Sequence, residues 1–407
     1  MTDTSVTPRA GATRWTCPFC LLLCDTSAVQ VDDATGALTL SGAGCACASR
    51  ALARFSARPH PALPQVDGTD CTIDEAVAAA ARLLAASRQP LFGGLGTDVS
   101  GARALYRLAC RTGAICDAAQ GAALMHGVRA LQDRGSFFTT LAEVRTRADL
   151  IVCLGDPPLE QAPDFFARCG VGDDTLVPQR QVLVLGGSAA GAIPLQGDLF
   201  GTVATLSALV ARRTVREASA PLAALAARLQ QARYAVIVGE TQRLPAQGAL
   251  VVEGVHRIVN TLNQTTRAAA MWLGGGNGAG TVNQVFTWLS GLPLRSRAGP
   301  RGLEHEPLCF DAQRLLAGQG ADSLLWVSSF DPETAPPATD LPTVVLGHPD
   351  LGRSRAAVFI PVSTPGIGSP GHLFRADGSV MLPLHAVFED TLPTLASVLD
   401  RIGRALA

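Results

Sequence analysis

Apolar residues along the chain fall into two recurring patterns. Short continuous apolar runs reach a glycine at residues 91–96, 148–158, 181–187 and 234–239, whereas the longer stretches between them space their apolar residues at helical intervals. Continuous runs are typical of strands buried on both faces, and helical spacing is typical of amphipathic helices. The alternation predicts parallel β-sheets that are covered by helices on both faces.

Start signals place several of the predicted helices. Thr72 and Glu75 form a capping box that opens a helix ending near Arg88. Ser100 is expected to cap a second helix, which ends near Gly113. Apolar spacing predicts further helices at 201–212, 215–232 and 388–405.

The C-terminal half repeats a pattern of the first half. Residues 148–158 and 321–333 both begin with Ala-Asp, continue with apolar residues and reach Asp-Pro. This similarity indicates a weak duplication of one α/β layer. We therefore predict an α/β fold with two parallel-sheet layers and a small cysteine-rich β module at the N-terminus. The predicted domains are residues 1–66 for the module, 67–245 for the first α/β domain and 246–407 for the second.

Composition and charge exclude several classes of protein. Of the 407 residues, 47% are hydrophobic and 16% charged, and the formal net charge is −1, which favours neither nucleic acid nor an anionic membrane as partner. All 33 basic residues are arginine, so mechanisms that use a lysine are excluded. Residues 1–16 have no apolar signal segment, and no run of eighteen apolar residues exists. A cytoplasmic location is expected.

The N-terminal cysteines are the strongest chemical signal. Cys17, Cys20 and Cys24 are spaced C-x2-C-x3-C, and either Cys45 or Cys47 can supply a fourth sulfur. Such a set suits a [4Fe-4S] cluster or a tetrahedral zinc ion. The apolar residues 21–23 between two of the cysteines favour a site sealed from water. Residues 28–31 and 37–40 are expected to form a hairpin that returns the chain toward this site.

Two other features concern ligand binding. Ligands of open parallel sheets bind beyond the carboxyl ends of the strands, where the turns after residues 154 and 328 are expected. The glycine-rich residues 274–280 precede a predicted helix. They are explained equally by an anion site at the helix N-terminus and by a close-packed turn.

With these features together, the chain resembles the molybdopterin oxidoreductase superfamily. The N-terminal cysteine motif, from Thr16 to Asp25, is similar to that of the B subunit of formylmethanofuran dehydrogenase, and residues 359–362, 374–378 and 382–384 agree with it. The resemblance implies a cluster that passes electrons to a molybdenum or tungsten atom. Two pterins and one cysteine or selenocysteine, directly before a His-Gly pair, hold that atom.

The metal-ligand position in this chain is occupied by methionine. Met125 precedes His126 and Gly127, and its neutral thioether cannot replace the anionic thiolate that a high-valent metal needs. We therefore expect a degenerate active site without molybdopterin. His126, a proton-transfer candidate in the family, is then expected to be a hydrogen-bonded histidine of the core or cleft. The N-terminal cysteines can hold a cluster, zinc or nothing.

This combination resembles the B subunit of the formyltransferase/hydrolase complex of aerobic methylotrophs. That resemblance implies a non-redox structural protein, with the A hydrolase, C and D formyltransferase subunits as partners. The complex transfers a formyl group from tetrahydromethanopterin to methylofuran and hydrolyses it to formate. The alternative is the catalytic molybdenum- or tungsten-pterin B subunit of formylmethanofuran dehydrogenase, with a [4Fe-4S] cluster.

Overall fold

The computed structural model describes residues 13–42, 45–58, 60–157, 159, 162–172, 176–351 and 356–406. It divides into two compact units. The first unit extends to Gly121 and also includes Gly275–Arg375 and the residues from Met381 onward, whereas Ala122–Gly274 and Ala376–Val380 form the second. These units differ from the predicted division at residues 66 and 245, because strands from both predicted α/β domains share one sheet.

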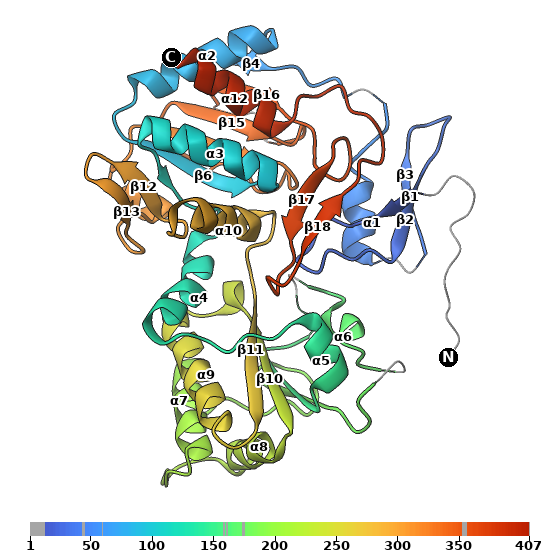
Figure 1. Ribbon diagram of the computed structural model, residues 1–407, viewed down its shortest axis with the longest axis vertical. Coiled ribbons are helices and arrows are strands. Elements are labelled where there is room, and N and C mark those ends of the chain that lie inside the picture. Colours follow the sequence, from blue (N-terminus) through green and yellow to red (C-terminus); the bar gives the residue numbers. More distant parts are fainter. Residues whose placement is uncertain are drawn as a thin grey trace. The chain divides into compact units, whose positions relative to one another are not determined.

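The N-terminal part of the first unit contains the predicted hairpin. Strands β1 (Thr13–Trp15), β2 (Ser27–Val31) and β3 (Leu38–Ser41) form an antiparallel sheet, and helix α1 (Ala46–Leu52) follows (Figure 1). The turn between β2 and β3 is held by Asp32, whose side chain accepts the N–H of Thr35 at 2.6 Å. An Asx turn of this kind is the reason why Asp is favoured at such a position.

A nine-stranded sheet forms the centre of the first unit. Its strand order is β13-β12-β7-β6-β14-β15-β16-β4-β5, and the five strands from β7 to β16 are parallel, whereas the four at the edges are antiparallel. The strands are β4 (Gln65–Val66), β5 (Thr69–Asp70), β6 (Pro90–Gly96), β7 (Ile115–Cys116), β12 (Ser296–Gly299), β13 (Gly302–His305), β14 (Ser323–Ser328), β15 (Thr343–Gly347) and β16 (Val358–Pro361). Every residue of β6, β14, β15 and β16 is buried, as their continuous apolar runs predict.

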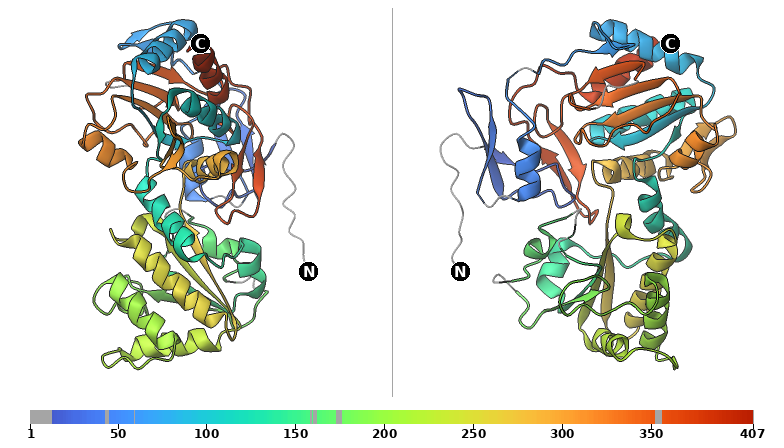
Figure 2. Two further views of the ribbon diagram at one scale, coloured as in Figure 1. Left: turned by 60° about the vertical axis from the view of Figure 1, so that its left-hand side comes forward. Right: turned by 180° about the vertical axis from the view of Figure 1, so that it is seen from behind.

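Helices cover both faces of this sheet. Helices α2 (Ile73–Ala86), α3 (Val99–Thr112) and α12 (Leu395–Ala405) pack together on one face, as Figures 1 and 2 show, and α10 (Ala279–Ser290) lies beside α3. Helix α11 (Ala312–Ala317) packs on the other face through Leu315 and Leu316. A separate hairpin, β17 (Gly371–Phe374) with β18 (Met381–Leu384), completes the unit.

The helix starts test two of the predicted caps. The Thr72–Glu75 capping box is confirmed, with the Thr72 hydroxyl accepting the Glu75 N–H at 3.3 Å and the Glu75 carboxylate accepting the Thr72 N–H at 2.8 Å. The cap predicted at Ser100 is wrong. Asp98 caps α3 instead, because its carboxylate accepts the N–H groups of both Ser100 and Gly101.

The second unit contains a four-stranded parallel sheet in the order β11-β10-β8-β9. Its strands are β8 (Leu150–Leu154), β9 (Gln181–Leu185), β10 (Tyr234–Glu240) and β11 (Arg267–Leu273). Its helices are α4 (Gly121–Arg134, whose first residue belongs to the first unit), α5 (Leu141–Arg147), α6 (Phe165–Arg168), α7 (Leu199–Val210), α8 (Ala220–Gln231), the short η1 (Thr241–Arg243) and α9 (Gly248–Leu262). Helices α7 and α9 lie on one face of the sheet, and α5 and α6 on the other (Figures 1 and 2).

Both units therefore have parallel sheets between helices, which confirms the α/β class. The two segments with the repeated pattern belong to separate sheets, since β8 lies in the four-stranded sheet and β14 in the nine-stranded one. None of the helices in the described part of the chain combines the length and the apolar character needed to cross a bilayer.

Candidate functional site

The chain between Cys17 and Cys24 folds into a closed loop. The N–H of Cys17 donates to the carbonyl of Cys24 at 2.9 Å, and Leu23 turns the chain with φ of 47°. Leu21, Leu22 and Leu23 are all buried. Leu23 packs in a small core with Phe330, Leu373 and Leu384. The apolar residues between the cysteines thus belong to the packed interior of the first unit.

Helix α1 brings the two later cysteines to this loop. Cys45 is the N-cap of α1, and its sulfur accepts the N–H of Ala48 at 3.3 Å. Cys47 lies in the first turn, and its thiol donates to the carbonyl of Phe19, 3.8 Å away, within the loop. Both cysteines lie close enough to Cys17 to affect its ionisation, so the structure does not favour either one as a fourth ligand.

Burial favours the neutral thiol at Cys17 and Cys20. Burial raises the pKa of Cys17 far above its ordinary value, and negative charge on Cys45, Cys24 or Cys47 would raise it further. A hydrogen bond with Cys24 and burial raise the pKa of Cys20 in the same direction. Several thiolates in this loop would therefore need a positive charge among them.

Cysteine sulfurs are suitable ligands for zinc or for an iron–sulfur cluster. In the described ranges, no three or more His, Cys, Asp or Glu side chains are placed so that they could hold a metal ion. The five cysteines lie together in this loop and at the start of α1.

Met125 and His126 lie in helix α4, in the part that belongs to the second unit. The Met125 side chain is buried, with 2% of its surface exposed. His126 is half-buried, and its ring packs against Gly248, the first residue of α9, where an added Cβ would come within 2.5 Å of the imidazole Cδ2. Gly248 is therefore needed to admit the His126 ring. The cysteine loop belongs to the first unit.

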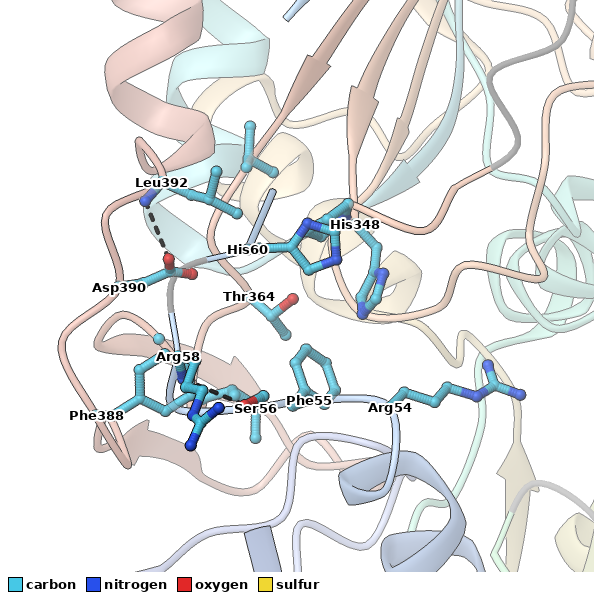
Figure 3. Close-up of a pocket in the computed structure, with 14 residues that line it drawn as sticks. Arg54, Phe55, Ser56, Arg58, His60, His348, Thr364, Phe388, Asp390 and Leu392 are labelled. Carbon is cyan, nitrogen blue, oxygen red and sulfur yellow. Dashed lines mark hydrogen bonds between the residues drawn. The ribbon is translucent and has the colours of Figure 1, made fainter. Parts of the chain in front are cut away.

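A pocket in the first unit was not predicted from the sequence. It lies beyond the carboxyl ends of β15 and β16, and Figure 3 shows His60 and His348 on one side with Phe55 and Arg58 on the other. The Nδ1 atom of His348 accepts the N–H of Asp350 at 3.0 Å, and burial lowers the pKa of His348 to about 4. His348 is thus a neutral imidazole whose Nε2–H has no hydrogen-bond partner in the described part of the chain.

Aromatic rings join this pocket to the cysteine loop. Ring centroids are 5.9 Å apart for Trp15 and Phe19, 5.8 Å for Phe19 and Phe55, and 4.9 Å for Phe55 and His348. The loop and the pocket consequently share one packed wall. A ligand in the pocket would meet apolar side chains together with at least as many polar or charged ones, Arg54, Arg58 and Asp390 among them.

The carboxylates at the turns predicted to bind ligands accept hydrogen bonds from other residues of the chain. Asp156, after β8, accepts the N–H groups of Ser188 and Ala189 at 2.6 and 2.8 Å, and these bonds lower its pKa. Asp331, after β14, accepts the N–H of Glu333 at 2.9 Å and the hydroxyl of Thr334 at 2.6 Å. Asp331 thus stabilises its own turn, whereas Asp156 stabilises the turn after β9.

The glycine-rich residues 274–280 have a packing explanation. An added Cβ at Gly274 would lie 2.2 Å from the Thr241 hydroxyl, and one at Gly278 would lie 2.5 Å from the Thr97 carbonyl. Gly278 also has φ of 78°, in the left-handed region. Of the two explanations from the sequence, the structure supports the close-packed turn.

Comparison with known proteins relates the chain to one-carbon enzymes. No profile of a known protein family matches it. It is 33% identical over 350 residues to the B subunit of the formyltransferase/hydrolase complex Fhc of Methylorubrum extorquens, an alignment that covers 83% of this chain and 96% of the relative. It is also 26% identical over 406 residues to the B subunit of tungsten-containing formylmethanofuran dehydrogenase 2 of Methanocaldococcus jannaschii, covering 89% and 90% of the two chains.

A solved structure agrees with the first relative. In the crystal structure of the formyltransferase/hydrolase complex FhcABCD from Methylorubrum extorquens with methylofuran, one chain superposes with a TM-score of 0.74 and 31% identity. The match covers 84% of this chain and 98% of that chain. With that coverage and identity, the chain belongs to the family of formyltransferase/hydrolase complex B subunits.

Proposed function

We propose that this chain is the B subunit of a formyltransferase/hydrolase complex and serves it as a non-redox structural component. The observation that carries the proposal is its likeness to the Methylorubrum extorquens protein, which spans 96% of that relative. The tungsten-containing dehydrogenase subunits are similar over as much of this chain, but at 26% and 25% identity.

Met125 supports the non-redox role on chemical grounds. A high-valent molybdenum or tungsten atom needs an anionic thiolate, whereas Met125 offers a neutral thioether. The side chain is also buried, so α4 uses it as a core residue. The dehydrogenase alternative would require another ligand. Cys116 is not suited to that task, because it is buried in β7 and burial raises its thiol pKa strongly.

The proposed role places the chemistry in partner subunits. The chain would assemble with the A hydrolase, C and D formyltransferase subunits. Formyl groups would pass from tetrahydromethanopterin to methylofuran in the formyltransferase and be released as formate in the hydrolase. This chain would contribute folded surface and stability to that assembly. A cytoplasmic location suits the eleven cysteines, which are all thiols.

Two features of the fold belong to the same proposal. Residues 13–58 have their own antiparallel sheet and a small core that includes Trp15, Val29 and Leu52, in keeping with a cysteine-rich module. We propose that this module is structural, with or without a metal at its thiols. The two parallel sheets would descend from one duplicated α/β layer.

Co-expression tests the assignment. The full chain, produced with the A, C and D subunits of a methylotroph complex, should elute with them from a sizing column in a fixed ratio. The complex should transfer and hydrolyse formyl groups, and leaving the chain out should reduce assembly. Full assembly and turnover without the chain would overturn the proposal.

A further inference from the structure

A groove opens at the amino ends of strands β10 and β11 in the second unit. It lies at the opposite ends of the strands from the turns after β8 and β10, and none of the residues discussed above as a candidate site lines it. Its most informative lining residues are three apolar and three basic side chains: Phe137, Phe138, Leu176, Arg147, Arg233 and Arg267.

The three apolar side chains are unusually exposed for their size. Phe137, Phe138 and Leu176 expose 48%, 60% and 58% of their surface. The two phenylalanines are held in place, because the N–H of Ala270 in β11 donates to the carbonyl of Phe137 at 3.0 Å and Phe138 bridges to Ala270 in parallel. A group of exposed apolar side chains on an ordered sheet edge marks a contact surface.

The backbone of this edge is already occupied. The side chain of Asn263 accepts the N–H of Ala268 at 3.1 Å and donates to its carbonyl at 2.8 Å. Both backbone groups of Ala268 are therefore already hydrogen-bonded. With Ala270 bonded to Phe137, strand addition at these positions is blocked. A partner must therefore bind through side chains rather than by extending the sheet.

The charge of the groove is positive. Arg147 lies 3.7 Å from Glu143, and Arg233 lies 3.6 Å from Asp149, whose carboxylate also accepts two backbone N–H groups. Arg267 pairs with none of the acidic residues that the structure describes. Among the described residues that line the groove, Glu143 is acidic and Arg147, Arg233 and Arg267 are basic. With Arg147 and Arg233 already beside acidic residues of this chain, the Arg267 guanidinium favours a carboxylate on the partner.

We propose that this groove binds a segment of another protein of the complex, in which apolar side chains are flanked by Asp or Glu. The inference rests on the proposed function, since it assigns a surface to the assembly. The apolar side chains of the segment would cover Phe137, Phe138 and Leu176, and its carboxylates would pair with the arginines at the rim. Aromatic and arginine side chains are the residues that most often dominate binding energy at interfaces.

Two groove variants and two controls test this inference in the full chain. Phe138→Ser removes the most exposed apolar side chain of the groove, and Arg267→Glu reverses the charge of its unpaired arginine. Leu250→Ser in α9, where the leucine is 47% exposed, and Arg213→Glu, at an exposed arginine after α7, are the matched controls. Affinity of each variant for a mixture of the A, C and D subunits is measured by titration, at low and at high salt.

We expect both groove variants to bind about tenfold more weakly or worse, and both controls to bind like the wild type. The defect of Arg267→Glu should shrink at high salt, whereas that of Phe138→Ser should persist. Thermal unfolding of each free chain shows that it is folded. If the wild type fails to bind the other subunits, the proposed function fails. If it binds and the groove variants bind as tightly as the controls, or if they alter only self-association, the groove proposal alone is overturned.

Discussion

Replacing Met125 separates its packing role from any chemical role. The side chain is 2% exposed in α4, so truncation to alanine removes its three outer heavy atoms from a closed interior. Deletions of this kind cost about 2–5 kcal/mol of unfolding free energy, because the lost transfer energy and the cavity add together. Leucine keeps nearly the same volume, so Met125→Leu should cost less than about 1.5 kcal/mol.

Turnover should respond differently from stability. If the chain is structural, both Met125 variants, assembled with the other subunits at a temperature where they stay folded, should transfer and hydrolyse formyl groups at the wild-type rates. Urea unfolding of the free chain gives the stability. Formate release by the assembled complex gives the turnover. Met381→Ala is the matched control, since Met381 is 44% exposed in β18 and should cost under about 0.5 kcal/mol.

Two results would each refute one step of the reasoning. If Met125→Leu assembles normally and unfolds like the wild type, yet loses most of its turnover, then the thioether takes part in the reaction. If Met125→Ala loses no more unfolding free energy than Met381→Ala does, the packing role is refuted instead. The two outcomes are independent, so the experiment tests each step separately.

Three further predictions follow from buried charge and from cofactor chemistry. Asp117→Ala should cost about 1–3 kcal/mol in urea unfolding, because the Arg295 guanidinium, 4% exposed, loses one buried carboxylate and keeps Asp311. Asp400→Ala at an exposed ion pair should cost less than about 1 kcal/mol, and equal costs would contradict this. Burial lowers the pKa of His348 to about 4 in the folded chain. Between about pH 6.5 and about pH 4 the unfolded chain therefore binds a proton at this residue and the folded chain does not, so the free energy of unfolding should fall as the pH falls through this range. Burial raises the pKa of Asp117 to about 6, so this residue changes stability in the opposite direction on acidification, in the wild type and in the variant alike. His348→Gln should therefore reduce the loss of stability on acidification. An unchanged dependence of stability on pH would count against the lowered pKa of His348. Elemental analysis of the purified complex should find neither molybdenum nor tungsten, and extraction should find no pterin; stoichiometric amounts of either metal with pterin would overturn the non-redox role.

Local patterns in the sequence predicted most elements of the fold but not their assembly. The capping box at Thr72 and the buried runs of β6 and β14 follow from neighbouring residues, and all three are present. The pairing of β6 with β14 joins segments more than two hundred residues apart, and apolar periodicity carries no information about such pairs. For this reason the predicted domain division differs from the two units of the structure. The start of α3 differs for a local reason, since Asp98 and Ser100 can both cap a helix.

The sequence predicted one part of the candidate site and missed another. The cysteine loop was recognisable because three thiols lie within eight residues. The pocket around His348 was not, because its walls come from residues 54–56, Arg58 and His60, from the end of β15 and from the segment around Asp390, and no sequence spacing connects these segments. One signal was present, since His348 follows directly after a continuous apolar strand, where ligands of parallel sheets bind.

The packing of the cysteine loop also bears on what its thiols mean. The Trp15 indole N–H donates to the carbonyl of Gly366 at 2.7 Å, and Trp15 shares a core with Ile367. Leu23, between two cysteines, fills a second core against the β17–β18 hairpin. These contacts hold the loop to the first unit through apolar burial and backbone hydrogen bonds, none of which requires a metal. The loop therefore has a packing role in the first unit, and its cysteines do not by themselves establish redox chemistry.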